Sequence, residues 1–261
     1  MPEGSPISGA DRSGVGRDRA DGTPRAPQPS ADGPGRDGGP ILAIDTATSV
    51  AYVALAGPTG SLLDVAAWTA GHRHGEELLP RIAALLSAQG LHATDLRGIV
   101  VGLGPGAFTG LRVGIATAKG LAAGLEIPIA GVRSADAIAA AAVAVGVASP
   151  EGRVAVLLPA GPSERTLDVN GSAHRLVAGV DPDLPSGTVL VAVDLDGRAP
   201  EDALARGAAA REAFAAELAR AGAARLRAGG DDLARVVPEY VTPPRGIAAP
   251  TGEVAWSRTR A

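Results

Sequence analysis

The chain has 261 residues and no cysteine, which excludes disulfides, thiolate zinc sites and cysteine nucleophiles. Its 28 acidic and 24 basic residues give a formal net charge of −4, and Lys119 is the single lysine. This balance argues against autonomous high-affinity nucleic-acid binding, which needs clustered cations. Six aromatic residues are too few for a platform on which nucleic-acid bases stack.

The first 40 residues contain seven prolines and nine glycines. We predict a disordered tail over 1–40, a second tail over 246–261 and about 220 residues of folded chain between them. The N-terminal segment contains Glu3 and Asp11 and lacks the apolar region of a secretory signal, so no such signal is expected there. The longest apolar run, 137–148, is too short for a bilayer-spanning helix of about 20 residues and predicts a buried helix. We therefore expect a soluble, cytoplasmic protein without membrane contact.

The folded chain is expected to begin with strands over 41–46, 50–56 and 61–68, whose short connections favour antiparallel pairing. A helix over 76–89 follows, because Leu78, Leu79, Ile82, Leu85 and Leu86 recur at helical spacing. A strand over 98–103, a loop over 104–110, a helix over 110–125 and a strand over 128–132 complete the order β-β-β-α-β-α-β.

A coarser version of this order follows. It has a helix from Ser134, strands over 153–158, 165–169 and 188–193, and a helix over 201–221. We therefore predict an α/β protein of two lobes, over 41–135 and 136–245.

The first predicted strand ends in Asp45 and Thr46, and hydroxyl residues continue to Ser49. This turn could bind a phosphate or a metal ion. Backbone approach to a phosphate usually needs glycine, and none occurs between Asp45 and Gly57. The alternative is a structural turn in which the carboxylate and hydroxyls satisfy backbone donors.

A second candidate ligand loop joins a strand to a helix and contains Gly104, Gly106 and Thr109. Such a junction can offer backbone amides to an anion. The phosphate-loop signature is absent, because Lys119 lies well inside the following helix. The alternative is a sharp turn that needs glycine for its conformation alone.

Two further clusters are weighed for chemistry. His72, His74, Glu76 and Glu77 lack the spacing that places two histidines on one helical face, so no metal site is predicted, and the acids complement the helix dipole. No serine, histidine and aspartate set with paired spacing is present. The sequence predicts no catalytic residue.

Small residues recur at Gly110, Gly114 and Ala118, so one face of this helix carries almost no side chain. Glycine inside a helix costs up to about 1 kcal/mol relative to alanine, and close approach of another element would offset that cost. The neighbour could lie within the chain or in another subunit. The partner interface predicted from this face and the preceding helix comprises Leu78, Leu79, Ile82, Leu86, Gly110, Leu111, Gly114, Ile115, Ala118 and Lys119.

Five segments carry a further signal: ILAIDTATSVAYVAL at 41–55, Leu78-Leu79-Pro80, GLGPGAFTGLRVGIATAKGLAAG at 102–124, IPIAGV at 127–132 and PEYVTPP at 238–244. Together they resemble the TsaB family of tRNA threonylcarbamoyladenosine (t6A) biosynthesis subunits, and the last segment is similar to the family's terminal strand. The second half departs from the family, because PAGPSER at 159–165 stands where an Asp-Ala-Arg type segment is common.

The resemblance implies an actin-like ATPase fold and a noncatalytic role beside TsaD, which transfers threonylcarbamoyl from its adenylate to tRNA. It also implies TsaE, an ATPase, as a further partner, ATP use by the complex with no cofactor held by this chain, and tRNA contact only through the complex. The alternatives are a hydrolase of the same fold, either a glycoprotease-like peptidase or a nucleotide phosphohydrolase, and a homodimeric binding module.

Overall fold

The computed structural model describes residues 38–71, 73–160, 164–177 and 179–241. The predicted tail over 1–40 lies outside the described residues except at its last three positions, and the tail over 246–261 lies entirely outside them. Contacts divide the chain into 1–33 and 34–261, and everything described below belongs to the second unit. The boundary between lobes at residue 135 stays a prediction.

The first sheet has five strands in the order β3-β2-β1-β4-β5. They are β1 (Ile41–Asp45), β2 (Val50–Ala56), β3 (Leu62–Thr69), β4 (Gly98–Gly102) and β5 (Ile129–Val132). Short turns join β1, β2 and β3, which pair antiparallel, whereas β1, β4 and β5 run parallel and are joined through helices. The predicted order of strands and helices is confirmed here, with a short 3-10 turn at Ala93–Asp95 added.

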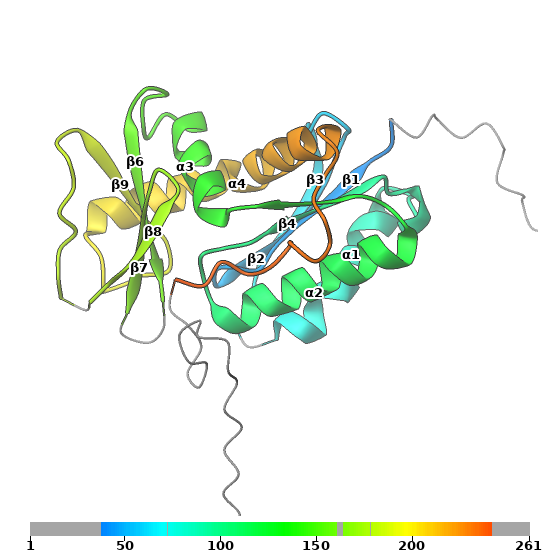
Figure 1. Cartoon of the computed structure of the whole chain (residues 1–261), viewed down its shortest axis with the longest axis horizontal. Coiled ribbons are helices and arrows are strands. Elements are labelled where there is room, and N and C mark those ends of the chain that lie inside the picture. The colour runs from blue at the N-terminus through cyan, green and yellow to red at the C-terminus, as the bar shows by residue number, and fades with distance from the viewer. Residues whose placement is uncertain (1–37, 72, 161–163, 178, 242–261) are drawn as a thin grey trace, which may run out of the picture. The chain divides into compact units, whose positions relative to one another are not determined.

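Two helices, α1 (His74–Ala88) and α2 (Phe108–Leu125), cover one face of this sheet (Figure 1). The apolar stripe that predicted α1 is the face that it buries, and α1 begins two residues earlier than expected. Ile115, Ala118 and Ala122 of α2 join the same core.

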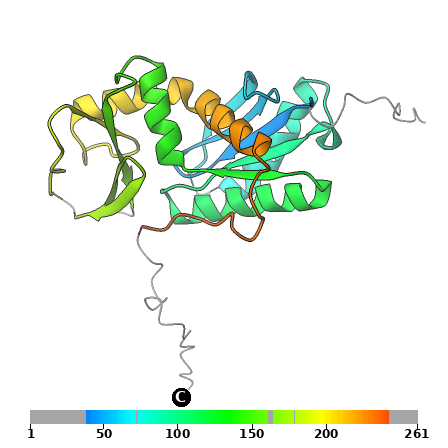
Figure 2. The ribbon, with the colours of Figure 1, turned by 45° about the horizontal axis from the view of Figure 1, so that its top comes forward.

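The helices α3 (Ser134–Ala144) and α4 (Glu201–Arg227) cover the other face of the first sheet and also pack on a second sheet, as Figure 2 shows. The alanine-rich run predicted to be a buried helix forms most of α3. Helix α4 continues past the predicted end at 221. Gly222 lies inside this helix and packs against Val100. A Cβ at Gly222 would be 2.2 Å from Val100 Cγ1.

The second sheet has the strand order β8-β7-β6-β9. Its strands are β6 (Arg153–Pro159), β7 (Arg165–Val169), β8 (Ser172–Leu176) and β9 (Thr188–Ala192). Strand β8 was not predicted, because it is an edge strand of half-exposed and exposed residues without an apolar run. Residues 238–241 form no strand, so the expected terminal strand is wrong over its described part. No helix among the described residues has the length and apolar character needed to cross a membrane.

Candidate functional site

Asp45 ends β1 and is completely buried. Its Oδ1 accepts a hydrogen bond from the Ala47 amide at 2.9 Å, and its Oδ2 accepts one from Ser134 Oγ at 2.5 Å. Burial raises the pKa of the Asp45 carboxyl to about 6, although both hydrogen bonds act to lower it. A Cβ at Gly102 would lie 1.7 Å from Oδ2, so the neighbouring strand needs glycine there.

A second carboxylate closes the turn that follows Asp45. Asp194 accepts hydrogen bonds from the backbone amide of Ser49 at 2.5 Å and from its hydroxyl at 2.6 Å. Asp194 also forms an ion pair with Arg211 of α4. The amides of Ala47 and Ser49 and the Ser49 hydroxyl are therefore bonded to the chain's own carboxylates, which supports the structural alternative for this turn.

The hydroxyls of the turn are also engaged inside the chain. Thr46 donates to the carbonyl of Gly110 at 2.7 Å, and Thr48 donates to the carbonyl of Val50 at 2.9 Å. Thr46 therefore links the end of β1 to the first turn of α2.

The glycine loop is packed against the same turn. Gly104 has φ of +92°, and a Cβ at Gly106 would be 2.1 Å from the carbonyl oxygen of Ala47. The loop is anchored at Ser134, whose amide donates to the Gly104 carbonyl at 2.7 Å and whose hydroxyl accepts from the Gly104 amide at 3.1 Å. These glycines are therefore needed for close packing, while Thr109 remains exposed.

The small-residue face of α2 is buried inside the chain, so its prediction as a partner surface is wrong. A Cβ at Gly110 would be 2.2 Å from the Thr46 carbonyl oxygen, and one at Gly114 would be 2.1 Å from Thr46 Oγ1. The side chains predicted to touch a partner that are instead buried here are Leu78, Ile82, Leu86, Leu111, Ile115 and Ala118. Of the ten predicted interface residues, Leu79 is exposed, and Lys119 is half-buried with its Nζ 3.3 Å from the Val236 carbonyl.

A second row of small residues lies on the outside of α2. We call Ala116, Gly120 and Gly124 the outer stripe, and all three are exposed. Among the described residues, none would lie within 4 Å of a Cβ added at Gly120 or Gly124. The sequence signal was present, because these residues also recur every four positions, but spacing alone does not distinguish the two faces.

The histidine and glutamate cluster is not brought together as a metal site. His72 lies outside the described residues, and Glu77 forms an ion pair with Arg73 at 2.9 Å. His74 is buried in the first turn of α1. Within the described ranges, no group of three or more histidine and carboxylate side chains could hold a metal ion.

A charged cluster that the sequence did not predict joins distant segments at Arg133. Its guanidinium donates to both carboxylate oxygens of Glu239, at 2.7 and 2.8 Å, and to Asp136 at 2.6 Å. It also pairs with the buried carboxylate of Asp168 on β7. Hydrogen bonds to Glu239 are the largest cause that raises the pKa of Arg133. The cluster is a clamp between α3, the second sheet and the C-terminal segment.

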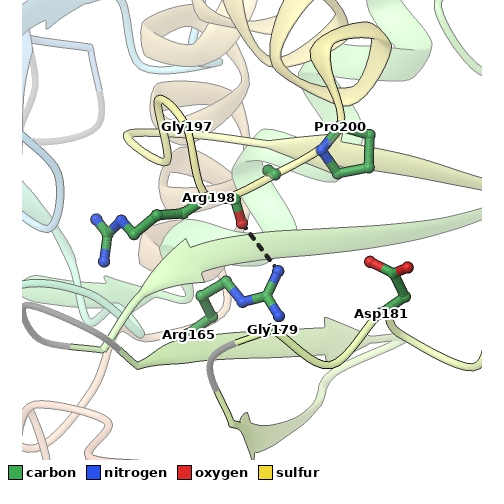
Figure 3. A pocket seen from close by; sticks show the side chains of 7 residues that line it. Arg165, Gly179, Asp181, Gly197, Arg198 and Pro200 are labelled. Atoms are coloured by element: carbon green, nitrogen blue, oxygen red, sulfur yellow. Dashed lines mark hydrogen bonds between the residues drawn. The ribbon is translucent and has the colours of Figure 1, made fainter.

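A cavity of about 410 Å³ in the second-sheet region contains Arg165, which is 5% exposed (Figure 3). Its guanidinium donates to the backbone carbonyls of Arg198 at 2.9 Å, Val180 at 2.5 Å and Val177 at 3.3 Å. Because these three carbonyls accept from both terminal nitrogens of the guanidinium, Arg165 fixes the surrounding loops.

Comparisons with known proteins agree with the sequence resemblance. The family model for TsaD, tRNA N6-adenosine threonylcarbamoyltransferase, matches residues 68–178. Relatives named tRNA threonylcarbamoyladenosine biosynthesis protein TsaB are 40% identical over 94 residues in Escherichia coli (strain K12) and 36% identical over 100 residues in Bacillus subtilis (strain 168). The resemblance to TsaB is confirmed.

These matches cover 35% and 38% of this chain, and 39% and 43% of the two TsaB relatives, so less than half of each relative is spanned. A solved structure, YeaZ from Pseudomonas aeruginosa, is similar with a TM-score of 0.59 and 25% identity over 77% of this chain and 99% of that chain. The expected fold class, two mixed sheets flanked by helices in the actin-like arrangement, is confirmed.

The segment that departs from the TsaB pattern lies between β6 and β7. These strands pair antiparallel, with Pro159 opposite Arg165 at the end of the ladder. Residues 161–163 lie outside the described residues. The buried Arg165 therefore has a structural role in the place where the family pattern is missing.

Proposed function

We propose that this chain is a noncatalytic accessory subunit of t6A biosynthesis that binds and supports a TsaD-type threonylcarbamoyltransferase. The similarity to proteins named TsaB carries this proposal. The engaged state of the turn at Asp45 supports a noncatalytic role, because its carboxylate and the Ser49 donors are occupied within the chain.

The outer stripe of α2 is the proposed contact surface for the partner. Its small side chains allow a partner helix to approach closely. Leu79 of the neighbouring helix α1 is 53% exposed and also offers an apolar side chain. In the proposed complex TsaE is the ATPase, ATP is used by the assembly, and tRNA is bound through the complex in the cytoplasm.

Reconstitution tests this function. TsaD from the same host, tRNA and threonylcarbamoyl adenylate are mixed with and without this chain, and t6A in the tRNA is quantified by mass spectrometry. We expect co-elution of the chain with TsaD, and more t6A when the chain is present.

Three outcomes would contradict the proposal. Modification of tRNA by this chain without TsaD would make it the catalyst. If the chain elutes as a homodimer and does not bind TsaD, a homodimeric binding module would be favoured. Hydrolysis of a peptide or of ATP by the pure chain would favour the hydrolase.

A further inference from the structure

A cavity of about 500 Å³ lies where α2 begins. Its walls come from the loop 105–110, from His74 of α1, from the end of β6 and from the C-terminal segment 239–241. In Figure 1 the red end of the described chain lies near the start of α2, where the rings of Tyr240 and Phe108 are 5.1 Å apart. This volume is within the range of small-molecule sites.

The first turn of α2 lines this cavity, and its backbone amides have no acceptor within the helix. Its N-cap residue, Ala107, makes no side-chain capping hydrogen bond, and the Ala107 amide donates to the Ala47 carbonyl. The amides of Phe108, Thr109 and Gly110 have no partner within the helix, because the first residues of any helix lack an acceptor one turn earlier. Together with the helix dipole, these groups favour an anion.

A buried histidine provides independent evidence for a ligand. His74 lines the cavity and is 6% exposed, and its Nε2 has no hydrogen-bond partner among the described residues. The Nε2 atom is 3.4 Å from the position that a Cβ on Gly110 would occupy, so it is directed at the first turn of α2. A buried polar atom without a partner is costly, and a bound acceptor would remove that cost.

The charge of the cavity walls limits the negative charge that a ligand can carry. The described residues that line the cavity include neither lysine nor arginine, and the one carboxylate, Glu239, shares the guanidinium of Arg133 with Asp136 and Asp168. A helix terminus offers about half a positive charge, which suits a single negative charge better than a phosphate group with two. Phe108, Tyr240 and Pro105 add an apolar wall.

The geometry points to a binding site for a small monocarboxylate with an apolar body. The carboxylate accepts hydrogen bonds from the first amides of α2 and from His74 Nε2–H, and the body lies against Phe108 and Tyr240. This site is separate from the outer stripe of α2, so it does not depend on the proposed partner.

Phenylacetate is the probe, and inorganic phosphate is the competing anion. Binding is measured by isothermal titration calorimetry on the full chain and by the change in melting temperature, since a ligand of the folded state raises it. We expect saturable one-to-one binding of phenylacetate, with at least tenfold weaker binding of phosphate.

Three variants test the assigned groups. His74→Leu removes the unpartnered nitrogen and should weaken phenylacetate binding at least tenfold without lowering the melting temperature. His174→Leu is the matched control on the exposed edge strand β8 and should bind as the unmodified chain does. Thr109→Glu places the chain's own carboxylate beside the same amides, so it should raise the melting temperature and weaken phenylacetate binding.

No saturable binding of phenylacetate to the unmodified chain would overturn the site. Unchanged binding in both folded His74→Leu and Thr109→Glu would also overturn it. Tighter binding of phosphate than of phenylacetate would overturn the assignment of a monocarboxylate. If His74→Leu does not fold, Thr109→Glu alone decides.

Discussion

Asp45 shows how a single buried carboxyl links the first sheet to α3. It accepts hydrogen bonds from Ala47 and Ser134, yet removal from water dominates and raises its pKa from 3.8 to about 6. The folded state therefore holds this proton more tightly than the unfolded state. The stability that protonation contributes is full below pH 3.8 and is lost as the pH rises through about 6.

Asp45→Asn is accordingly expected to gain stability relative to the unmodified chain as the pH rises. The pKa of Asp45 rises by about two pH units on folding, which corresponds to about 3 kcal/mol. This value is the upper bound for how much the free energy of unfolding of Asp45→Asn, relative to that of the unmodified chain, changes between pH 4 and pH 7.5. Urea unfolding of both proteins at the two pH values measures it. A difference in the free energy of unfolding that is independent of pH would contradict the raised pKa.

The turn at Asp45 also leads to an expectation about ATP. Asp45 and Asp194 accept hydrogen bonds from the amides of Ala47 and Ser49, so these two donors are not offered to a phosphate. We expect ATP hydrolysis by the pure chain at background rate. Sustained hydrolysis that disappears in Asp45→Ala would show that the turn is catalytic.

At the scale of elements, glycine decides how closely α4 approaches the first sheet. Gly222→Ala would place Cβ 2.2 Å from a methyl of Val100, a β-branched side chain with little freedom to move. The overpacking should cost about 1–3 kcal/mol, more than the gain of up to about 1 kcal/mol in helix propensity. Gly120→Ala is the matched control on the open side of α2 and should gain stability. Thermal unfolding of the two variants gives the comparison, and equal changes would contradict the close approach.

The clamp at Arg133 connects elements that are far apart in sequence. Arg133→Gln leaves the buried carboxylate of Asp168 without its cation, which should cost about 3 kcal/mol and release the segment around Glu239. Arg175→Gln, whose ion pair with Glu164 is half-exposed, is the control and should cost less than about 1 kcal/mol. Urea unfolding measures both changes, and hydrogen exchange at 236–241 reports the release. Similar changes in the two variants would contradict the role of the clamp.

Local pattern predicted these elements better than it predicted the site. The apolar stripe of α1 and the short turns between β1, β2 and β3 are local signals, so the first sheet could be predicted in order. Arg133 and its partners lie up to 106 residues apart, and no spacing rule brings them together. The two small-residue rows of α2 have the same period, so only Thr46 beside Gly114 shows which row is buried.

For the whole molecule, α2 is packed on the first sheet and leaves one surface outward. The inner row of small residues, Gly110, Gly114 and Ala118, is buried, and its two glycines pack against Thr46. The outer stripe is exposed. The second sheet is attached through α3, α4 and the clamp at Arg133. The proposed role of the chain is therefore to present α2 to a partner, while the turn at Asp45 serves the fold.

Two leucine substitutions separate the partner surface from the core. Gly114→Leu would collide with Thr46 Oγ1, so it should lower the melting temperature strongly, whereas Gly120→Leu meets open space and should leave it nearly unchanged. Differential scanning calorimetry gives both values. A folded and stable Gly114→Leu would contradict the assignment of the inner row to the core.

The affinity of Gly120→Leu for TsaD from the same host tests the central claim most directly. Isothermal titration calorimetry compares it with the unmodified chain and with Gly120→Ala, which adds a single methyl group. We predict that Gly120→Leu binds TsaD at least tenfold more weakly while its melting temperature is kept, and that Gly120→Ala binds nearly as the unmodified chain does. Unchanged affinity of Gly120→Leu, or no binding of TsaD by the unmodified chain, would contradict the account.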